Sequence, residues 1–167
     1  MMLAKKLFRI LVLTVIATAS VQISIAQKVD TSHVIQWKAA ARPSKSPADL
    51  TISLTATIQP GWHLYALDQE QGGPMPTVIR LADAQPFALA GAVQQPEPVL
   101  ATDPNFDMPV RFFEHSATFT VPVARKGTAK PKPTSITLDV SYQTCNDRFC
   151  LPLTTAKVEA RLPSAAH

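Results

Sequence analysis

Several short segments of the chain alternate between apolar and polar residues with a period of two. In residues 51–58, Thr-Ile-Ser-Leu-Thr-Ala-Thr-Ile, the apolar side chains fall on one side and the hydroxyl side chains on the other. This pattern is typical of a β-strand with one buried face. It also marks residues 117–123, 136–142 and 156–162, and weaker strand candidates are residues 34–39, 62–67, 77–81 and 87–93.

Proline and glycine residues separate these segments and predict turns. They cluster in residues 42–47, 59–61, 72–76 and 126–133. No segment keeps a 3.6-residue apolar period over three turns, so we predict no long helix. About seven or eight short strands in roughly 140 residues predict an all-β fold, a single antiparallel β-sandwich. Pro122 lies inside a clear strand and predicts that this strand is at a sheet edge or contains a bulge.

The first 26 residues have the features of a secretory signal peptide. Two lysines and an arginine precede an apolar stretch of about ten residues, and Ser-Ile-Ala at residues 24–26 fits a cleavage site. A retained membrane anchor is the alternative, but polar residues interrupt the run before it reaches the roughly 20 apolar residues of a spanning helix. We therefore expect cleavage near Ala26 and an exported mature domain of residues 27–167 outside the cytoplasm, which is not inserted in the membrane.

The basic charge of the chain comes mostly from the predicted signal peptide. The whole chain has 16 Lys and Arg residues against 12 Asp and Glu residues, but three of the basic residues precede residue 27. The mature domain is left with 13 basic and 12 acidic residues, a net charge of +1. A nearly neutral domain gives no reason to expect nucleic acid or an anionic membrane surface as a partner.

The only two cysteines, Cys145 and Cys150, lie in one segment, Tyr-Gln-Thr-Cys-Asn-Asp-Arg-Phe-Cys-Leu-Pro-Leu at residues 142–153. Disulfides persist outside the cytoplasm. A bond that closes a loop of about six residues stabilises a fold by roughly 2 kcal/mol, against about 4 kcal/mol for a loop of some sixty residues. The pair is therefore a poor staple. Its spacing alone leaves open both a permanent clip on a hairpin and redox chemistry.

Local geometry permits a reversible bond between the two cysteines. If the strand at residues 136–142 continues, Cys145 falls on its polar side, which places the thiol at the sheet margin rather than in the core. An Asn-Asp pair then favours a turn, and Cys150 returns opposite Cys145 within reach of a disulfide. Arg148 favours a thiolate and Asp147 disfavours one, so the net electrostatic effect is left open.

Three short motifs of the chain are similar to those of one known family. They are Tyr142-Gln143 with the two cysteines and Leu151-Pro152, Gly-Trp-His-Leu-Tyr at residues 61–65, and Gly-Gly-Pro-Met-Pro-Thr at residues 72–77. The first resembles the active-site segment of the N-terminal periplasmic domain of the thiol:disulfide interchange protein DsbD. The second resembles that family's Gly-aromatic-x-x-Tyr strand, and the third a Gly-Gly-Pro stretch of its stand-alone relatives.

The resemblance implies an immunoglobulin-like sandwich whose cysteine pair cycles between dithiol and disulfide without a cofactor. In that family the domain takes electrons from a membrane-embedded carrier and passes them to periplasmic thioredoxin-like proteins, such as disulfide isomerases and proteins of cytochrome c maturation. Full-length DsbD also has a membrane domain and a thioredoxin-like domain, so we expect both partners of this chain to be separate proteins. The resemblance favours Cys150 as the cysteine that bonds to the partner and Cys145 as the resolving one. Electron flow in the opposite direction is the alternative.

The resemblance also implies a short loop with an aromatic residue that shields the cysteines until a partner docks. By register from the following strand this loop is expected at residues 104–108, with Phe106 as the shield or, alternatively, as an ordinary core residue. His63 and Tyr65 share one strand face and are expected to line the site; the alternative is a surface histidine and a packed tyrosine. Tyr142 is expected to line the site as well.

Two other interpretations of the cysteine segment are a metal site and a structural clip. Soft or borderline ligands are present, namely His63, His115, Met75 and Met108. The blue-copper ligand pattern and zinc-site spacing are absent, so we predict no metal. A non-enzymatic, immunoglobulin-like interaction module with a structural disulfide is the stronger alternative to a thiol–disulfide oxidoreductase.

Overall fold

The structure is a computed structural model that describes residues 33–44, 49–127 and 132–163. The predicted signal peptide lies outside the described residues. No helix occurs in the described ranges, and therefore none there is long and apolar enough to cross a membrane.

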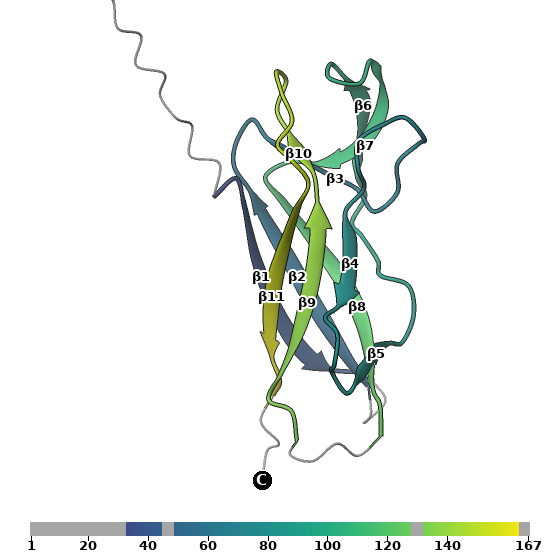
Figure 1. Cartoon of the computed structure of the whole chain (residues 1–167), viewed down its shortest axis with the longest axis vertical. Coiled ribbons are helices and arrows are strands. Elements are labelled where there is room, and N and C mark those ends of the chain that lie inside the picture. The colour runs from purple at the N-terminus through teal and green to yellow at the C-terminus, as the bar shows by residue number, and fades with distance from the viewer. Residues whose placement is uncertain (1–32, 45–48, 128–131, 164–167) are drawn as a thin grey trace, which may run out of the picture. The chain divides into compact units, whose positions relative to one another are not determined.

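Eleven strands form three antiparallel sheets in the described part of the chain (Figure 1). The sheets have the strand orders β1-β2-β8-β5, β11-β9-β4 and β10-β3-β7-β6. The strands are β1 (Ile35–Pro43), β2 (Asp49–Ile58), β3 (His63–Tyr65), β4 (Val78–Leu81), β5 (Phe87–Leu89), β6 (Val99–Asp103), β7 (Met108–Phe113), β8 (Ser116–Arg125), β9 (Ser135–Tyr142), β10 (Thr144–Cys145) and β11 (Thr154–Arg161).

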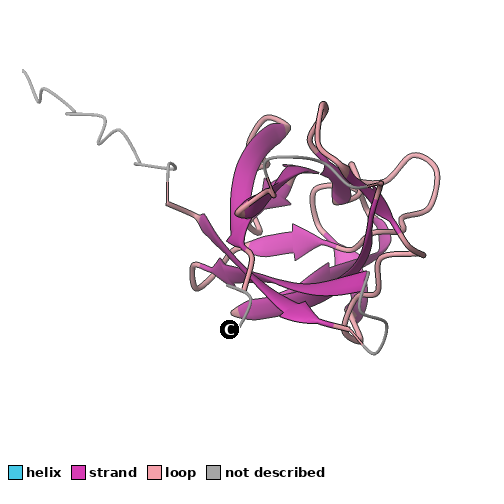
Figure 2. Cartoon of the chain, turned by 90° about the horizontal axis from the view of Figure 1, so that it is seen from below, coloured by secondary structure: helices cyan, strands magenta, loops and turns pink. Residues whose placement is uncertain are grey.

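The first two sheets enclose the main hydrophobic core (Figure 2). Leu54 of β2, Phe119 of β8 and Leu138 of β9 have no exposed surface and belong to this cluster. On the outer face, the hydroxyl groups of Thr55 and Thr118 lie 3.0 Å apart and share a hydrogen bond. The alternation in the sequence therefore predicts both the buried and the exposed faces of β2 and β8, and the all-β, antiparallel sandwich is confirmed.

The alternation does not predict β6 and β7. In β7 the adjacent residues Phe112 and Phe113 are both buried, because they point to opposite faces of the sheet and both faces are covered. In β6, residues 99–102 are all exposed. Neither strand therefore shows the period-two pattern of a sheet with one buried face.

The prediction that the strand of Pro122 lies at a sheet edge or contains a bulge is wrong, because β8 pairs with β2 in an unbroken register on one side and with β5 on the other. The proline is tolerated because β5 ends at Leu89, just before the position opposite Pro122. The carbonyl of Pro122 accepts a hydrogen bond from the Ala90 N–H at 2.9 Å. The reciprocal bond, which proline cannot donate, is the one that is missing.

The third sheet lies at one end of the sandwich, at the top of Figure 1, and separates two apolar clusters. Leu64 and Phe113, which pair across β3 and β7, belong to the main core. The next pair, Tyr65 and Phe112, faces the other way and forms a second cluster with Cys145 and Val110. The alternation of β3 and β7 therefore gives this end of the molecule a small apolar cluster of its own, built around a cysteine.

Candidate functional site

The two cysteines form a disulfide across a four-residue turn. Cys145 and Cys150 pair as an antiparallel bridge with their Cα atoms 4.0 Å apart. The Asn146 side chain shapes the turn, because its Oδ1 accepts hydrogen bonds from the N–H groups of Arg148 and Phe149, both at 2.9 Å. The predicted Asn-Asp turn, and the return of Cys150 opposite Cys145, are confirmed.

Cys145 is more deeply buried than its sequence position predicts. Its exposed fraction is 0%, whereas Cys150 is half-buried. The strand does not continue past Tyr142: β9 ends there, Gln143 intervenes, and Thr144 and Cys145 pair with β3 instead. The prediction that Cys145 lies at the sheet margin is therefore wrong, because Cys145 lies inside the second apolar cluster.

The turn of the β6–β7 hairpin, residues 104–107, lies beside this disulfide. Phe106 at this turn is half-buried and packs on the second cluster, together with Met108 and Cys150. Its ring meets that of Tyr65 edge to face, with centroids 6.1 Å apart. The structure therefore brings Phe106, Tyr65 and the cysteine pair together.

A buried carboxylate anchors the turn end of this hairpin. Asp103 is 2% exposed, and its Oδ2 accepts a 2.6 Å hydrogen bond from the Tyr65 hydroxyl. Its Oδ1 accepts bonds from the Asn105 N–H at 2.7 Å and from Asn105 Nδ2 at 3.0 Å. Burial, and then the bond to and charge of Asp103, raise the pKa of the Tyr65 hydroxyl far above its usual range. Tyr65 therefore stays a neutral donor.

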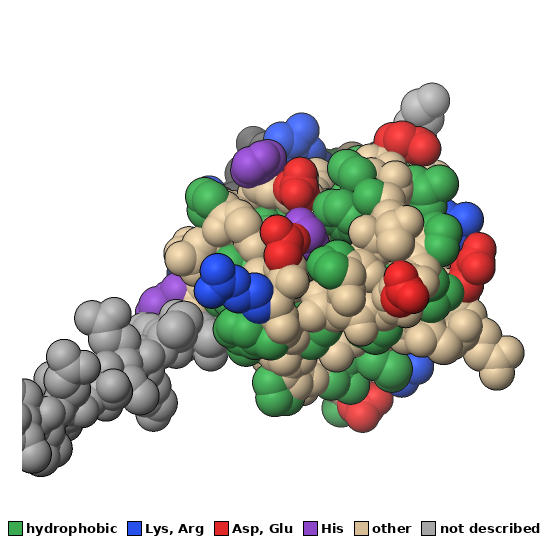
Figure 3. Space-filling model, turned by 90° about the horizontal axis from the view of Figure 1, so that it is seen from above, with side chains coloured by type: hydrophobic (Ala, Val, Ile, Leu, Met, Phe, Trp, Pro, Cys, Tyr) green, Lys and Arg blue, Asp and Glu red, His purple; other side chains and the backbone are tan. Residues whose placement is uncertain are grey.

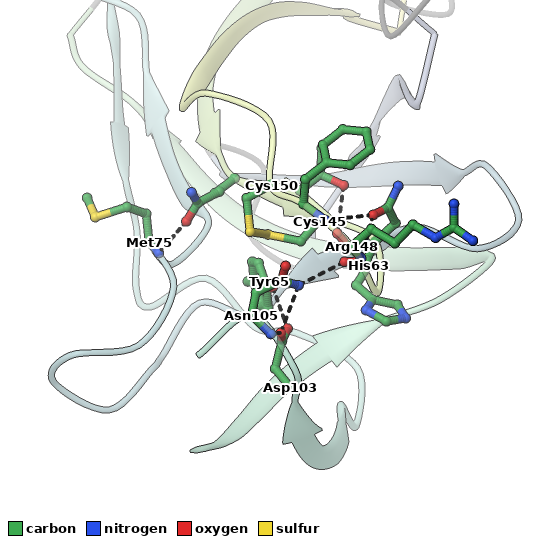
Figure 4. Close-up of a disulfide and its surroundings, with 12 residues drawn as sticks. His63, Tyr65, Met75, Asp103, Asn105, Cys145, Arg148 and Cys150 are labelled. Carbon is green, nitrogen blue, oxygen red and sulfur yellow. Dashed lines mark hydrogen bonds between the residues drawn. A yellow bond between two sulfur atoms is a disulfide. The ribbon is translucent and has the colours of Figure 1, made fainter. Parts of the chain in front are cut away.

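A hydrogen bond joins the hairpin turn directly to the cysteine turn. Asn105 Nδ2 donates to the main-chain oxygen of Asn146 at 2.8 Å (Figure 4). Asn105 is thus held by Asp103 on one side and by the cysteine turn on the other. The sequence signal for this contact is only a pair of turn-forming asparagines, and our sequence reasoning missed the Asn105 contact.

His63 lies directly opposite Cys145 in the pairing of β3 with β10. Its Nε2 is 3.2 Å from the Glu114 carboxylate, and its ring stacks on Phe112 with centroids 4.3 Å apart. The Thr144 hydroxyl donates to the His63 carbonyl at 2.7 Å. His63 and Tyr65 therefore share the face that carries the disulfide.

Tyr142 does not line this site, contrary to the expectation from the sequence. It is buried in the main core, where its ring meets that of Trp37 at a centroid distance of 5.4 Å. Burial, partly offset by the Trp37 indole, raises the pKa of its hydroxyl. As the last residue of β9, it follows the inward-facing set of that strand, whereas Cys145 belongs to the next strand.

Exposed apolar side chains occur on the cysteine turn and on segments that flank it. Phe149, between the cysteines, is 43% exposed and packs edge to face on Trp62 at 5.5 Å. Met75 and Leu153 are each 52% exposed, and the Met75 N–H donates to Gln143 Oε1 at 2.9 Å. Seen from this end, the surface has hydrophobic patches beside acidic and histidine side chains (Figure 3). In the described part of the chain, no three His, Cys, Asp or Glu side chains gather as a metal site would require.

The fold and the site together define an immunoglobulin-like β-sandwich domain with one disulfide next to an aromatic hairpin turn. Residues 31–162 match the family model of the thiol:disulfide interchange protein DsbD, N-terminal. The chain belongs to this family of DsbD N-terminal domains. Membership implies redox partners in general. A disulfide pair in such a domain is consistent with thiol–disulfide exchange.

Two solved structures are similar to the chain in fold. The reduced N-terminal domain of DsbD from Neisseria meningitidis has a TM-score of 0.53 and 16% identity, and the match covers 80% of this chain and 89% of that one. The N-terminal periplasmic domain of ScsB from Proteus mirabilis has a TM-score of 0.55 and 18% identity, with coverages of 75% and 45%. The match thus spans less than half of the ScsB domain. No curated protein sequence is similar enough to the chain to count as a match.

Proposed function

We propose that this domain relays electrons by thiol–disulfide exchange through a reversible Cys145–Cys150 pair. The observation that carries the proposal is the position of the disulfide, which closes a short turn at the end of the sandwich, next to the hairpin turn that contains Phe106. A bond that spans so few residues contributes little as a staple. The hairpin turn is hydrogen-bonded to the cysteine turn, and the chain belongs to the DsbD N-terminal family. Both observations support a redox role in which the hairpin shields the disulfide until a partner protein binds.

The exchange begins in the reduced domain. The Cys150 thiolate attacks a sulfur of the partner's disulfide, forms a mixed disulfide and releases one partner thiolate. Cys145 then loses its proton to solvent and attacks the Cys150 sulfur. The Cys145–Cys150 bond forms, the bond to the partner breaks, and the second partner thiolate leaves. Two electrons pass to the partner, and the greater exposure of Cys150 supports its role as the attacking residue.

The partners that fit this reaction are thiol proteins outside the cytoplasm. The ScsB domain of similar fold is periplasmic, and the first 26 residues of this chain have the pattern of a cleaved signal peptide. A membrane-embedded thiol carrier would re-reduce the pair. Periplasmic thioredoxin-like proteins, such as a disulfide isomerase or a protein of cytochrome c maturation, would accept the electrons, each as a separate chain. The pair itself needs no cofactor.

A structural role for the disulfide is the second candidate function. The full burial of Cys145 favours it, because a buried disulfide sulfur is hard for a thiolate to reach. In that case the domain would be a non-enzymatic interaction module, and the exposed apolar side chains around the turn would form its binding surface.

The reduction potential separates these two functions. Residues 27–167 would be equilibrated with reduced and oxidised glutathione, and the thiol and disulfide forms counted by alkylation and mass spectrometry. We expect both the thiol form and the disulfide form to be populated at ratios of reduced to oxidised glutathione that can be prepared in a buffer. A potential well below about −300 mV would mean a structural disulfide and would exclude the proposed relay.

A further inference from the structure

His63 is the titratable side chain that the sheet places directly across from Cys145. The two residues are partners in the antiparallel pairing of β3 with β10. Side chains at such positions lie on the same face of the sheet, with Cβ atoms about 4.5–5.5 Å apart. Phe112 links them further, because it stacks on the His63 ring and belongs to the apolar cluster of Cys145.

The other side of His63 is held by a carboxylate. Continuing the pairing of β3 with β7 places Glu114 beside His63, and its Oε1 is 3.2 Å from His63 Nε2. The His63 side chain is only 13% exposed, against 45% for Glu114. When the imidazole is protonated, the two therefore form an ion pair in which the positive partner is the more buried one and lies on the side of the cysteine.

The remaining charged groups around His63 are few. Asp147 and Arg148 of the cysteine turn are both exposed, and Figure 4 draws Arg148 on the same side of the disulfide as His63. On β6, Asp103 is bound to Tyr65 and Asn105. Two side chains can therefore carry a positive charge here. The Arg148 side chain is exposed, whereas the His63 side chain, when protonated, is half-buried.

We propose that the protonated His63 imidazole stabilises the thiolate of reduced Cys145, and so favours the attack of Cys145 on the Cys150–partner bond. The inference rests on the proposed function for its role in exchange. His63 acts through its charge, as a positioning residue, and forms no bond to the reacting sulfur. A cation near a thiol favours the thiolate, and in the small apolar cluster this effect is screened less than in water.

The thiolate can be measured directly in a domain with one cysteine. In the Cys150→Ser variant, absorbance near 240 nm against pH reports the thiolate of Cys145 alone. His63→Phe keeps a ring to stack on Phe112 but removes the charge, and we expect it to lower the fraction of thiolate about two-fold near pH 7, where an imidazole is ordinarily still partly protonated. His63→Lys restores a positive charge, and its midpoint should stay at or below that of the parent variant. His115→Asn is the matched control and should titrate like the parent.

Unchanged titration in His63→Phe would overturn the inference, as would a His63→Lys variant that behaves like His63→Phe. His63→Gln is a second neutral variant if His63→Phe does not fold, and far-ultraviolet circular dichroism checks each fold. The titration needs neither a partner nor a disulfide. It can therefore fail while the glutathione measurement supports exchange, and it can succeed while that measurement shows a structural disulfide.

Discussion

Asn105, in the turn of the β6–β7 hairpin, donates a 2.8 Å hydrogen bond to the main-chain oxygen of Asn146, between the two cysteines. The same side chain also donates to Asp103, which anchors the hairpin to Tyr65. A movement of the hairpin away from the disulfide must therefore break the bond to Asn146. Phe106, the next residue, would move with it. This bond links the aromatic turn directly to the cysteine turn.

Loss of the Asn105 side chain should expose the disulfide more often. A typical hydrogen bond contributes about 1 kcal/mol, so Asn105→Ala should raise the rate of reduction by dithiothreitol about five-fold. The reduction would be stopped at successive times, and alkylation of the free thiols would give its rate. Thr55→Ala is the control, because it removes an exposed side-chain hydrogen bond on β2, in a different sheet. Equal rates in Asn105→Ala and the unmodified domain would mean that the bond does not hold the hairpin closed.

The Tyr65–Asp103 bond should contribute strongly to stability. Tyr65→Phe leaves the buried Asp103 carboxylate without its phenol donor, and we expect the free energy of unfolding in urea to fall by about 1.5–3 kcal/mol. Asp103→Asn and the double variant complete a double-mutant cycle. The two single effects should sum to clearly more than the effect of the double variant. Strictly additive effects would show that the two side chains are not coupled.

The same tyrosine predicts a loss of stability in alkali. In the folded state the pKa of Tyr65 is raised well above its ordinary value of 10.0. The unfolded chain therefore releases this proton first as the pH rises past about 10, and the free energy of unfolding falls by up to about 1.4 kcal/mol per pH unit. Tyr65→Phe should lose stability less steeply between pH 9 and 11, measured by urea unfolding. Parallel curves would contradict the prediction.

The sequence predicts a strand when one face of the strand is buried, and fails to predict it when both faces are buried. The alternation of Leu54 or Phe119 with threonines identifies β2 and β8, because one face of that sheet is in water. Phe112 and Phe113 give no such pattern, since β7 is covered on both faces of its sheet. The prediction for Cys145 is wrong for a different reason: the strand ends at Tyr142, and no local residue pattern marks the change of pairing partner to β3.

The site was predictable where contacts are local and not where they are distant. The turn between the cysteines follows from the turn-forming chemistry of Asn146 over three residues. The Asn105–Asn146 bond spans 41 positions in sequence, and the Tyr65–Asp103 bond spans 38. Each depends on how the hairpin packs on the third sheet. The family motifs supplied the approximate location of Phe106, but tertiary structure supplies its hydrogen-bonded neighbours.

The two cysteines should differ in reactivity because they differ in burial. Cys145 has no exposed surface, whereas Cys150 is half-buried at the end of the turn. Cys145→Ser, which retains Cys150, should therefore form mixed disulfides at least about ten-fold faster than Cys150→Ser, because exchange depends on access to the thiol. The reaction with an aromatic disulfide reagent, followed by the absorbance of the released thiolate, gives both rates. In urea the two variants should react at similar rates, which would identify burial as the cause. Faster reaction of the retained Cys145 in the folded domain would reverse the assignment and make Cys145 the residue that meets the partner.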